Sequence, residues 1–397
     1  MFRGASIPPI RYADPWSETL DQRIRMLTRP GACRRVAYLY EQPDTSTFRY
    51  RAHNMIRALC GAPDIAAAWF AGHEIEYLLP LIGQCDVLVV CRVRYNERVA
   101  ALLARAHHLG VDTAFDVDDL VFDTDYVHLL LETLDQPVTE QAWEVWFAMV
   151  GRLGATFRQC RRAIVTNAYL AARAARFAPE KPIAVVPNFL GRDQLAVSQR
   201  ILQQKRGCGF ASERRIHLGY FSGTPTHNRD FLVIADALAR VLARDERLVL
   251  RIVGFLDMPP VLAEFARRIE RYPLQDFLNL QRLIGETELN LVPLQDNAFT
   301  NCKSELKYFE AAVAGTATIA SPTFTLRAAI KDGVNGWLAT APQWADRIAA
   351  ALADRERYRE VAEAAAAHAV ATYAPDAVVG AIRAALFPEE CRRQENR

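Results

Sequence analysis

The sequence predicts an α/β protein built from two Rossmann-like, doubly wound domains. Three observations predict this class. The chain has 397 residues with 51% hydrophobic content, which is enough for two α/β domains with full cores. Alternating strand and helix patterns begin at Arg35 and begin again at Ile216. Between them, an Arg- and Gln-rich stretch near residues 189–210 is typical of a surface connector.

These patterns divide the chain into four parts. We expect an N-terminal extension over residues 1–34 that packs on the first domain, a first domain over 35–195, a second over 210–372, and a C-terminal helix and tail over 373–397. The apolar runs predict strands at residues 35–40, 64–70, 86–91, 163–166, 184–188, 216–221, 248–253, 289–293 and 316–321, and a further strand that ends in an acidic loop at 116–123.

Composition limits the function classes. The formal net charge is +2 and the pI about 8.1, too near balance for a nucleic acid to be the main partner. The eight cysteines show no CxxC or metal-ligand spacing, which indicates reduced thiols in the cytosol. No apolar run is long enough for a signal peptide or a membrane span. We therefore expect a cytoplasmic protein, and a peripheral contact with the inner face of the membrane stays open.

The stretch 301–322 is the most informative. Lys303, Lys307 and Glu310 are spaced by four and three residues, which places them on one face of a predicted helix. Gly315 suits the position after that helix, and a short buried strand follows it. A charged helix face that leads through a glycine into a buried strand favours an anion or sugar site. The alternative is a surface helix with ordinary ion pairs.

A second motif lies about eighty residues upstream. Ser222, Gly223 and Thr224 follow a hydrophobic strand, and a helix is predicted to start near Asn228 or Arg229. The glycine lets a ligand approach the backbone, and the start of the helix offers N–H groups to a phosphate. Arg229 would add a charge-assisted contact. The alternative is that these residues only cap the helix.

Two further stretches follow strands of the first domain, at the sheet edge where open α/β sheets bind ligands. The acidic loop contains Asp116, Asp118 and Asp119, and it would bind a cation, orient sugar hydroxyls or supply a base. The polar loop after the first strand leads to Arg49 and Arg51, which would meet an acceptor or the donor phosphates. The alternatives are an acidic loop that only caps a turn and arginines that only face solvent.

Residues 127–162 form a long helical and aromatic segment. Trp143, Trp146 and Phe147 lie at three- and four-residue spacing. Such a stripe favours core or domain packing over a platform for a sugar.

With these motifs the chain resembles GT-B glycosyltransferases of the large retaining family 4, the glycosyl transferases group 1. Glu310 and the following Ala-Ala-Val-Ala-Gly match the second Glu of the family's Glu-x7-Glu motif, which binds the nucleotide ribose. The first Glu would fall on Cys302, a departure that leaves the contact to the donor sugar to Lys303 or Glu305. The loop FSGTPTHNRDF and the helix KSELKYFEAA resemble a divergent branch of bacterial surface-polysaccharide transferases.

The resemblance implies a function and a set of roles. A nucleotide-sugar would bind at Ser222, Gly223, Thr224, Arg229, Lys303, Lys307 and Glu310, and an acceptor at Arg49, Arg51 and Asp116, with Asp118, Asp119, Arg229 and Lys303 as catalytic residues. The acceptor would be a saccharide, a lipid-linked molecule or a protein. Because cationic side chains would stabilise the leaving phosphate, no metal or cofactor is expected. The family also implies retention of configuration and a last helix that crosses back to the first domain. A nucleotide-sugar epimerase and a catalytically silent saccharide-binding or scaffold module are the alternatives.

Overall fold

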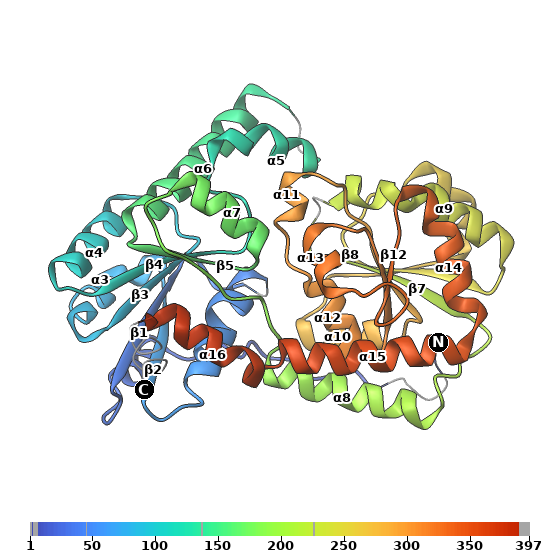
Figure 1. Cartoon of the computed structure of the whole chain (residues 1–397), viewed down its shortest axis with the longest axis horizontal. Coiled ribbons are helices and arrows are strands. Elements are labelled where there is room, and N and C mark those ends of the chain that lie inside the picture. The colour runs from blue at the N-terminus through green and yellow to red at the C-terminus, as the bar shows by residue number, and fades with distance from the viewer. Residues whose placement is uncertain (1, 3–6, 45, 136–137, 225–226, 389–397) are drawn as a thin grey trace.

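The computed structural model describes residues 2, 7–44, 46–135, 138–224 and 227–388. Figure 1 shows two α/β domains side by side, each with helices packed around its own sheet. In the described part of the chain the strands form two six-stranded sheets, and every pairing within them is parallel. The predicted pair of doubly wound domains is confirmed.

The first sheet has the strand order β2-β1-β3-β4-β5-β6. Helices cover both faces of this sheet, so all seven residues of β2 and all five residues of β3 are buried. The strands are β1 Arg34–Tyr40, β2 Ile65–Ala71, β3 Val87–Cys91, β4 Asp112–Val117, β5 Arg162–Val165 and β6 Ile183–Val185.

The second sheet has the order β12-β11-β10-β7-β8-β9, which is the 3-2-1-4-5-6 order of a dinucleotide-binding domain. The edge strand β9 was not predicted. Its sequence, Ile-Glu-Arg-Tyr, is charged and only partly buried, so it lacks the apolar run on which the prediction depends. The strands are β7 Ile216–Ser222, β8 Leu248–Gly254, β9 Ile269–Tyr272, β10 Leu289–Val292, β11 Ala317–Ala320 and β12 Trp337–Leu338.

The helices alternate with these strands along the chain. Those of the first domain are α1 Leu20–Leu27, α2 Asn54–Leu59, α3 Ile75–Leu78, α4 Glu97–His108, α5 Val127–Thr133, α6 Glu140–Gln159 and α7 Ala168–Phe177. The later ones are α8 Arg192–Gly207, α9 Asn228–Arg244, α10 Phe277–Gly285, α11 Ala298–Asn301, α12 Leu306–Val313, α13 Phe324–Ala329, α14 Trp344–Ala353, α15 Arg355–Tyr373 and α16 Pro375–Leu386. A π-helical turn at Arg49–His53 leads into α2, and a 3-10 segment spans Pro260–Arg268.

The last helices join the two domains. The long helix α15 packs along α12 of the second domain, and α16 packs on α2 of the first (Figure 1). Arg162 fixes this end of the chain, because its guanidinium donates hydrogen bonds to the carbonyl oxygens of Ala385 and Leu386. The crossing of residues 375–386 back to the first domain therefore occurs as the family resemblance implies.

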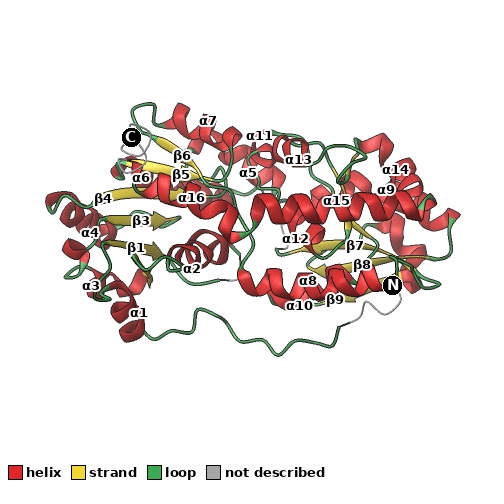
Figure 2. Ribbon diagram, turned by 60° about the horizontal axis from the view of Figure 1, so that its bottom comes forward, coloured by secondary structure: helices red, strands yellow, loops and turns green. Residues whose placement is uncertain are grey.

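The N-terminal segment differs from the prediction. It does not pack on the first domain alone but runs along both domains, as Figure 2 shows. Phe2 is buried in the second domain against Phe210 and Tyr358, and Tyr12 contacts Phe277 of α10. Only from Trp16 onward, followed by α1, does the segment pack on the first domain.

Candidate active site

A cleft of about 820 Å³ lies between the two domains. The first domain lines it with the loops after β1, β3 and β4 and with one face of α6. The second domain lines it with the loop after β7, the start of α10 and the segment from α11 to α12. The loops after β1, β3, β4 and β7 follow the carboxyl ends of their strands, which is where doubly wound sheets bind ligands.

The acidic loop after β4 faces this cleft with two of its carboxylates. Asp118 accepts hydrogen bonds from Thr47 Oγ1 at 2.8 Å and from Arg92 Nη1 at 2.9 Å. Asp119 lies 3.4 Å from the same guanidinium nitrogen and 3.7 Å from Nζ of Lys303, which belongs to the second domain. Burial alone would oppose ionisation of Asp119, but Lys303 and Arg92 outweigh it and hold the pKa of its carboxyl below the ordinary value. Both carboxylates are therefore held in a charged cluster that spans the cleft.

Arg92 organises this cluster although the sequence analysis did not place it in the site. It follows β3 directly and has a left-handed backbone with φ of 52°, which is uncommon for a residue other than glycine. Its backbone N–H donates to the carbonyl oxygen of Asp116 at 2.9 Å, and this bond fixes the turn that aims the side chain at Asp118. Backbone strain of this kind is concentrated at functional sites.

Asp116 and Arg51 do not reach the cleft, and their predicted role in acceptor binding is corrected here. Both side chains are fully buried, and they form a two-pronged ion pair at 2.7 and 2.8 Å. Arg51 also donates to the carbonyl oxygen of Val186 at 2.7 Å. The pair ties the helical turn after β1 to the ends of β4 and β6, so its role is structural.

Glu310 lines the cleft but is already engaged on one side. Its Oε1 accepts hydrogen bonds from Arg49 Nη2 at 3.1 Å, from the hydroxyl of Tyr50 and from Gln194 Nε2 at 3.0 Å. Because all three donors meet Oε1, Oε2 is the oxygen left for a ligand. Arg49 and Tyr50 belong to the first domain, so the carboxylate also joins the two domains. Arg49 is buried rather than solvated, and it lies at the cleft as predicted.

The loop after β7 is placed as predicted. Ser222 is buried, and its hydroxyl donates to the carbonyl oxygen of Thr224 at 2.9 Å, which holds the turn. Gly223 and Thr224 are exposed at the cleft, and a Cβ atom added to Gly223 would meet nothing within 4 Å. The described part of this loop therefore leaves room for a ligand beside its backbone.

Two lysines line the cleft near this loop: Lys303 lies just before α12, and Lys307 lies within it. The helix begins only at Leu306, so Lys303 precedes it instead of sharing its face with Lys307 and Glu310, as the spacing predicted. All three still line the cleft. Burial lowers the pKa of Lys307 to about 8, and the charge of Lys303 acts in the same direction, against Asp230 and Glu310.

Cys302, which stands at the position of the family's first Glu, is buried beneath the cleft. Its carbonyl oxygen accepts a hydrogen bond from Asn167 Nδ2 at 2.7 Å, and burial raises the pKa of its thiol to about 12. Glu305 does not line the cleft either. Of the two suggested substitutes, only Lys303 reaches it.

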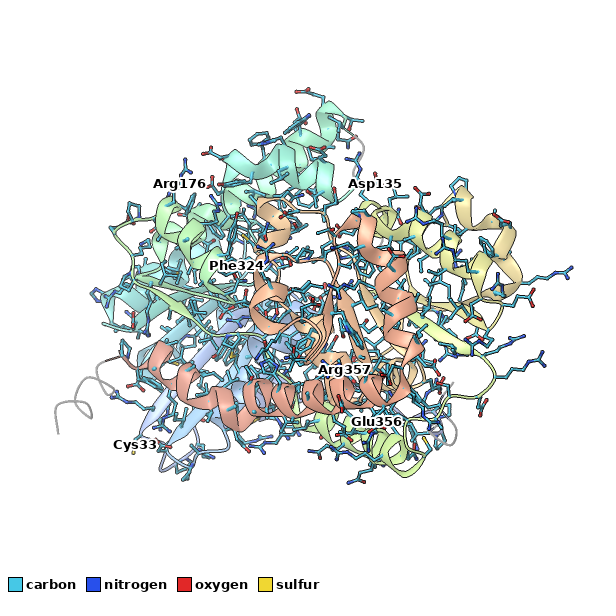
Figure 3. All side chains as sticks on the ribbon, turned by 45° about the vertical axis from the view of Figure 1, so that its right-hand side comes forward. Cys33, Asp135, Arg176, Phe324, Glu356 and Arg357 are labelled. Carbon is cyan, nitrogen blue, oxygen red and sulfur yellow. The ribbon has the colours of Figure 1, made fainter. Side chains whose placement is uncertain are left out.

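Arg229 also differs from its predicted place in the site. It does not line the cleft but points to the first domain, where its Nε donates to Asp135 Oδ1 at 3.0 Å and its Nη1 lies 3.9 Å from Glu132. Asp135 lies at the tip of the α5 and α6 pair, next to the second domain (Figure 3). Arg229 therefore bridges the domains at the surface, outside the set of residues that line the cleft.

His227 and Asp230 occupy the position beside the cleft that was predicted for Arg229. His227 lines the cleft, and its Nδ1 lies 2.9 Å from Oδ2 of Asp230 in the first turn of α9. Sequence reasoning missed this pair, although the His-x-x-Asp spacing at a helix start was a signal for it. The aromatic stripe of α6 also divides: Trp146 lines the cleft, whereas Trp143 and Phe147 stack on each other at 5.6 Å and do not line it.

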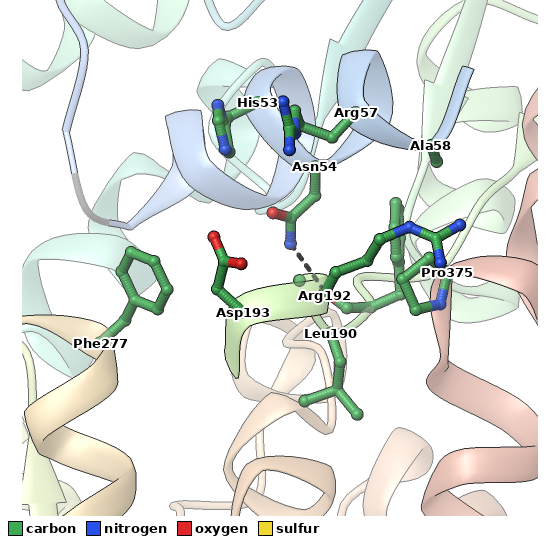
Figure 4. Close-up of a pocket in the computed structure, with 11 residues that line it drawn as sticks. His53, Asn54, Arg57, Ala58, Leu190, Arg192, Asp193, Phe277 and Pro375 are labelled. Carbon is green, nitrogen blue, oxygen red and sulfur yellow. Dashed lines mark hydrogen bonds between the residues drawn. The ribbon is translucent and has the colours of Figure 1, made fainter. Parts of the chain in front are cut away.

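A small pocket of about 30 Å³ lies where the domains join (Figure 4). His53 and Asn54 line it from the first domain, and the start of α8, the start of α10 and Pro375 of α16 line the rest. Asn54 Nδ2 donates to the carbonyl oxygen of Phe189 at 2.9 Å, which ties α2 to the connecting segment. The pocket is large enough for little more than a water molecule, and residues of both domains line it.

The comparisons with known proteins agree with this geometry. Residues 215–354 match the model of the family described as glycosyl transferases group 1. The D-inositol 3-phosphate glycosyltransferase of Nocardia farcinica (strain IFM 10152) is 30% identical over 153 residues, which are 34% of this chain and 33% of that protein. The match thus spans about a third of the length of the curated relative.

Solved structures match over most of the chain. HepE of Anabaena, solved in complex with UDP and glucose, has a TM-score of 0.59 at 12% identity, and the match covers 89% of this chain and 99% of that one. Sucrose-phosphate synthase of Thermosynechococcus elongatus has a TM-score of 0.59 at 14% identity, with coverage of 90% and 98%.

The fold and the interdomain cleft define a protein of the GT-B class. Residues 215–354 of the second domain match the group 1 glycosyl transferase model, and the solved structures share the fold, so the predicted resemblance to GT-B glycosyltransferases is confirmed. Among the described residues, no helix combines the length and the apolar character needed to span a membrane.

Proposed function

We propose that this protein is a glycosyltransferase that moves a sugar from a nucleotide-sugar donor to a saccharide, lipid-linked or protein acceptor, in the synthesis of a bacterial surface polysaccharide or glycoconjugate. One observation carries the proposal. The exposed Gly223 loop, the ammonium groups of Lys303 and Lys307 and the carboxylate of Glu310 line the same side of one cleft, opposite the Asp118 and Asp119 carboxylates.

The donor would lie against the second domain. Its ribose hydroxyls would donate to Oε2 of Glu310, because a carboxylate oxygen accepts the hydrogens of a diol. Its pyrophosphate would lie between the Gly223 loop and the two lysines, whose positive charge stabilises the negative charge that develops on the leaving phosphate. Arg229 has no part in this arrangement. UDP-glucose is the first donor to test, since HepE was solved with UDP and glucose.

The acceptor would approach from the first domain. Asp118 and Asp119 are held by Arg92 in fixed positions and would orient hydroxyls of the acceptor or of the transferred sugar. Trp146, from α6 of the same domain, also lines the cleft and offers an apolar surface. Retention of configuration is proposed from the family resemblance, and an NMR-assigned product of inverted configuration would contradict it.

We also propose that transfer needs no divalent metal. The acidic loop is the natural candidate for a metal site, but Arg51 pairs with Asp116, and Arg92 with Asp118 and Asp119. These cations occupy the carboxylate oxygens that a metal would require. Full activity in EDTA supports the proposal. Loss of activity in EDTA and recovery with Mg²⁺ or Mn²⁺ would contradict it and would make the acidic loop the metal site.

A cytoplasmic location is part of the proposal. The seven cysteines in the described ranges are all free thiols, and four of them are buried. Free thiols are typical of a reducing compartment. A contact with the inner face of the membrane would bring a lipid-linked acceptor within reach. Fractionation of cells that express the tagged protein, with and without a high-salt wash, tests both points.

Sugar transfer itself is tested with a panel of sugar nucleotides and acceptors. Donor-dependent labelling of an acceptor supports the proposed function. Interconversion of free sugar nucleotides without an acceptor would indicate the epimerase. Binding of saccharide without turnover of any donor would indicate the silent module.

A further inference from the structure

The pair formed by His227 and Asp230 has no role in the arrangement described so far. His227 stands directly before α9, and Asp230 lies three residues later in its first turn. The Asp230 side chain is 2% exposed and that of His227 is 15% exposed. Oδ1 of Asp230 accepts hydrogen bonds from the backbone N–H and from Nε2 of Gln295, each at 3.1 Å. These two donors and the His227 ring, 2.9 Å from Oδ2, fix the carboxylate in place.

This geometry sets the tautomer of the imidazole. Burial raises the pKa of the Asp230 carboxyl, but the hydrogen bonds from His227 and Gln295 outweigh burial and lower that pKa, so Asp230 is ionised. An ionised carboxylate only accepts hydrogen bonds, so Nδ1 of His227 carries the proton. The ring edge with Nδ1 is turned to Asp230, which leaves the edge with Nε2 for the cleft that His227 lines.

The surroundings keep the ring neutral. Burial lowers the pKa of His227 to about 4, and the charges of Lys307 and Lys303 act in the same direction, while Asp230 opposes them. A neutral ring with its proton on Nδ1 presents a bare lone pair on Nε2. That lone pair repels a phosphate oxygen but accepts the hydrogen of a hydroxyl.

We propose that His227, positioned by Asp230, is the general base that removes the proton from the attacking hydroxyl of the acceptor. The inference rests on the proposed function. The hydroxyl gives its proton to Nε2, and its oxygen forms a bond to the anomeric carbon of the donor. The bond between that carbon and the phosphate oxygen breaks, and its electron pair leaves with the nucleoside diphosphate. The imidazolium then returns its proton to water.

The position of the base also bears on stereochemistry. His227 belongs to the same domain and the same side of the cleft as Lys303 and Lys307, which take the leaving phosphate. An acceptor deprotonated there attacks the face of the sugar from which the phosphate departs, which retains configuration. Attack from this side agrees with the retention proposed from the family resemblance.

The test measures turnover, nucleotide affinity and the rescue of turnover by added imidazole. His227→Gln keeps a polar side chain but removes the basic nitrogen. We expect this variant to lower kcat about 10²- to 10⁴-fold, the usual contribution of a general base. Affinity for UDP by calorimetry should stay within about twofold. In His227→Ala, added imidazole should restore part of the lost turnover. Melting temperatures show whether each variant is folded.

Asp230 is proposed as a positioning residue. Its test therefore needs a measurement that would not change if Asp230 only stabilised the fold. Nitrogen NMR of the labelled wild-type protein should show His227 as the Nδ1–H tautomer at pH 7, and Asp230→Asn should lose that tautomer along with turnover. His53→Gln is the matched control. Burial also lowers the pKa of His53 to about 4, but this residue lies outside the central cleft and its loss should leave kcat unchanged.

The outcomes separate this inference from the proposed function. Wild-type turnover in His227→Gln would overturn the base while sugar transfer stands. Parallel loss of turnover and of UDP affinity would make His227 a donor-binding residue and would also overturn it. A wild-type protein that transfers sugar from no donor would overturn the proposed function, and the base with it.

Discussion

At the scale of single residues, Glu310 has two roles, one for each carboxylate oxygen. Its Oε1 holds Arg49, Tyr50 and Gln194, and Oε2 is left for the ribose. Glu310→Gln should therefore weaken binding of a nucleoside diphosphate by about 1–3 kcal/mol, the usual cost of a lost charge-assisted hydrogen bond. Calorimetry measures this loss, and Glu363→Gln, which removes a surface partner of Arg206, is the control. Unchanged nucleotide affinity would refute the placement of the ribose.

Asp118 and Asp119 face the donor from the other domain. They should act on the acceptor or the transferred sugar, which affects the transition state more than donor affinity. Asp118→Asn or Asp119→Asn should lower turnover at least about tenfold while nucleotide affinity stays near the wild-type value. Asp123→Asn is the control, because Asp123 caps the next turn through the N–H of Asp125 and lies outside the cleft. Its loss should cost about 1 kcal/mol of stability without loss of turnover. Full activity in both cleft variants would mean that the loop only caps a turn.

Lys307 predicts a pH dependence. The group is charged below its pKa of about 8 and neutral above it, so its attraction for the pyrophosphate is lost as the pH rises through that value. Affinity of the free protein for UDP should therefore fall between pH 7 and pH 9. In Lys307→Arg the charge persists, so the same titration should be flat over this range. A falling profile in both proteins would assign the titration to another group.

The residues of the site differ in how far the sequence could predict them. Lys303, Lys307 and Glu310 were found because they are neighbours along the chain and face the same cleft. Tyr50 was missed because its contact with Glu310 joins residues 260 positions apart, and no local pattern encodes that distance. Arg51 and Asp116 were placed in the site by the same reasoning that found Asp118. Only the packing shows that this arginine turns inward to neutralise the carboxylate.

At the scale of elements, the strands were the easiest to predict because burial on both faces leaves continuous apolar runs. The exceptions have physical causes. The edge strand β9 pairs with one neighbour only and carries charged side chains, so it lacks such a run. The predicted helix over Lys303 starts three residues later, at Leu306, after a turn that follows the short helix α11. Spacing alone placed the lysine on the correct wall of the cleft but not on the helix.

Helix α6 gives an element-scale prediction. Trp146 turns toward the cleft, whereas Phe147, the next residue, is exposed and stacks on Trp143. Trp146→Ala should raise the KM for the acceptor roughly fivefold, which corresponds to about 1 kcal/mol for a lost aromatic contact. The KM for the donor should change little. Phe147→Ala is the control, and an equal effect of both substitutions would indicate loss of helix packing rather than of an acceptor contact.

At the scale of the whole molecule, several contacts join the domains around the cleft. Arg49 pairs with the buried Glu310, Lys303 approaches Asp119, and Arg229 pairs with Asp135 at the surface. On the opposite side, α16 packs on α2. Sequence patterns predicted both sheets but not this arrangement, because each contact pairs a residue of one domain with a residue of the other. The proposed donor residues of the second domain and acceptor residues of the first domain therefore face each other only in the cleft between the domains.

The N-terminal segment gives the last prediction. Phe2 is buried in the second domain, where the ammonium of Lys205 lies 4.4 Å from its ring centre, and Trp16 is buried against Phe48 in the first. Between them, Ile10 exchanges two backbone hydrogen bonds of 2.9 Å with the Asn279 side chain. The segment thus ties both domains together, and removal of the Phe2 ring would leave a cavity beside a buried lysine. Phe2→Ala should lower the free energy of unfolding by about 3–5 kcal/mol, as for other buried aromatic side chains. It should also increase hydrogen exchange near Lys205. Phe2→Leu keeps most of the apolar volume, so both effects should be smaller in that variant. An unchanged melting temperature in Phe2→Ala would show that this end of the chain does not anchor the second domain.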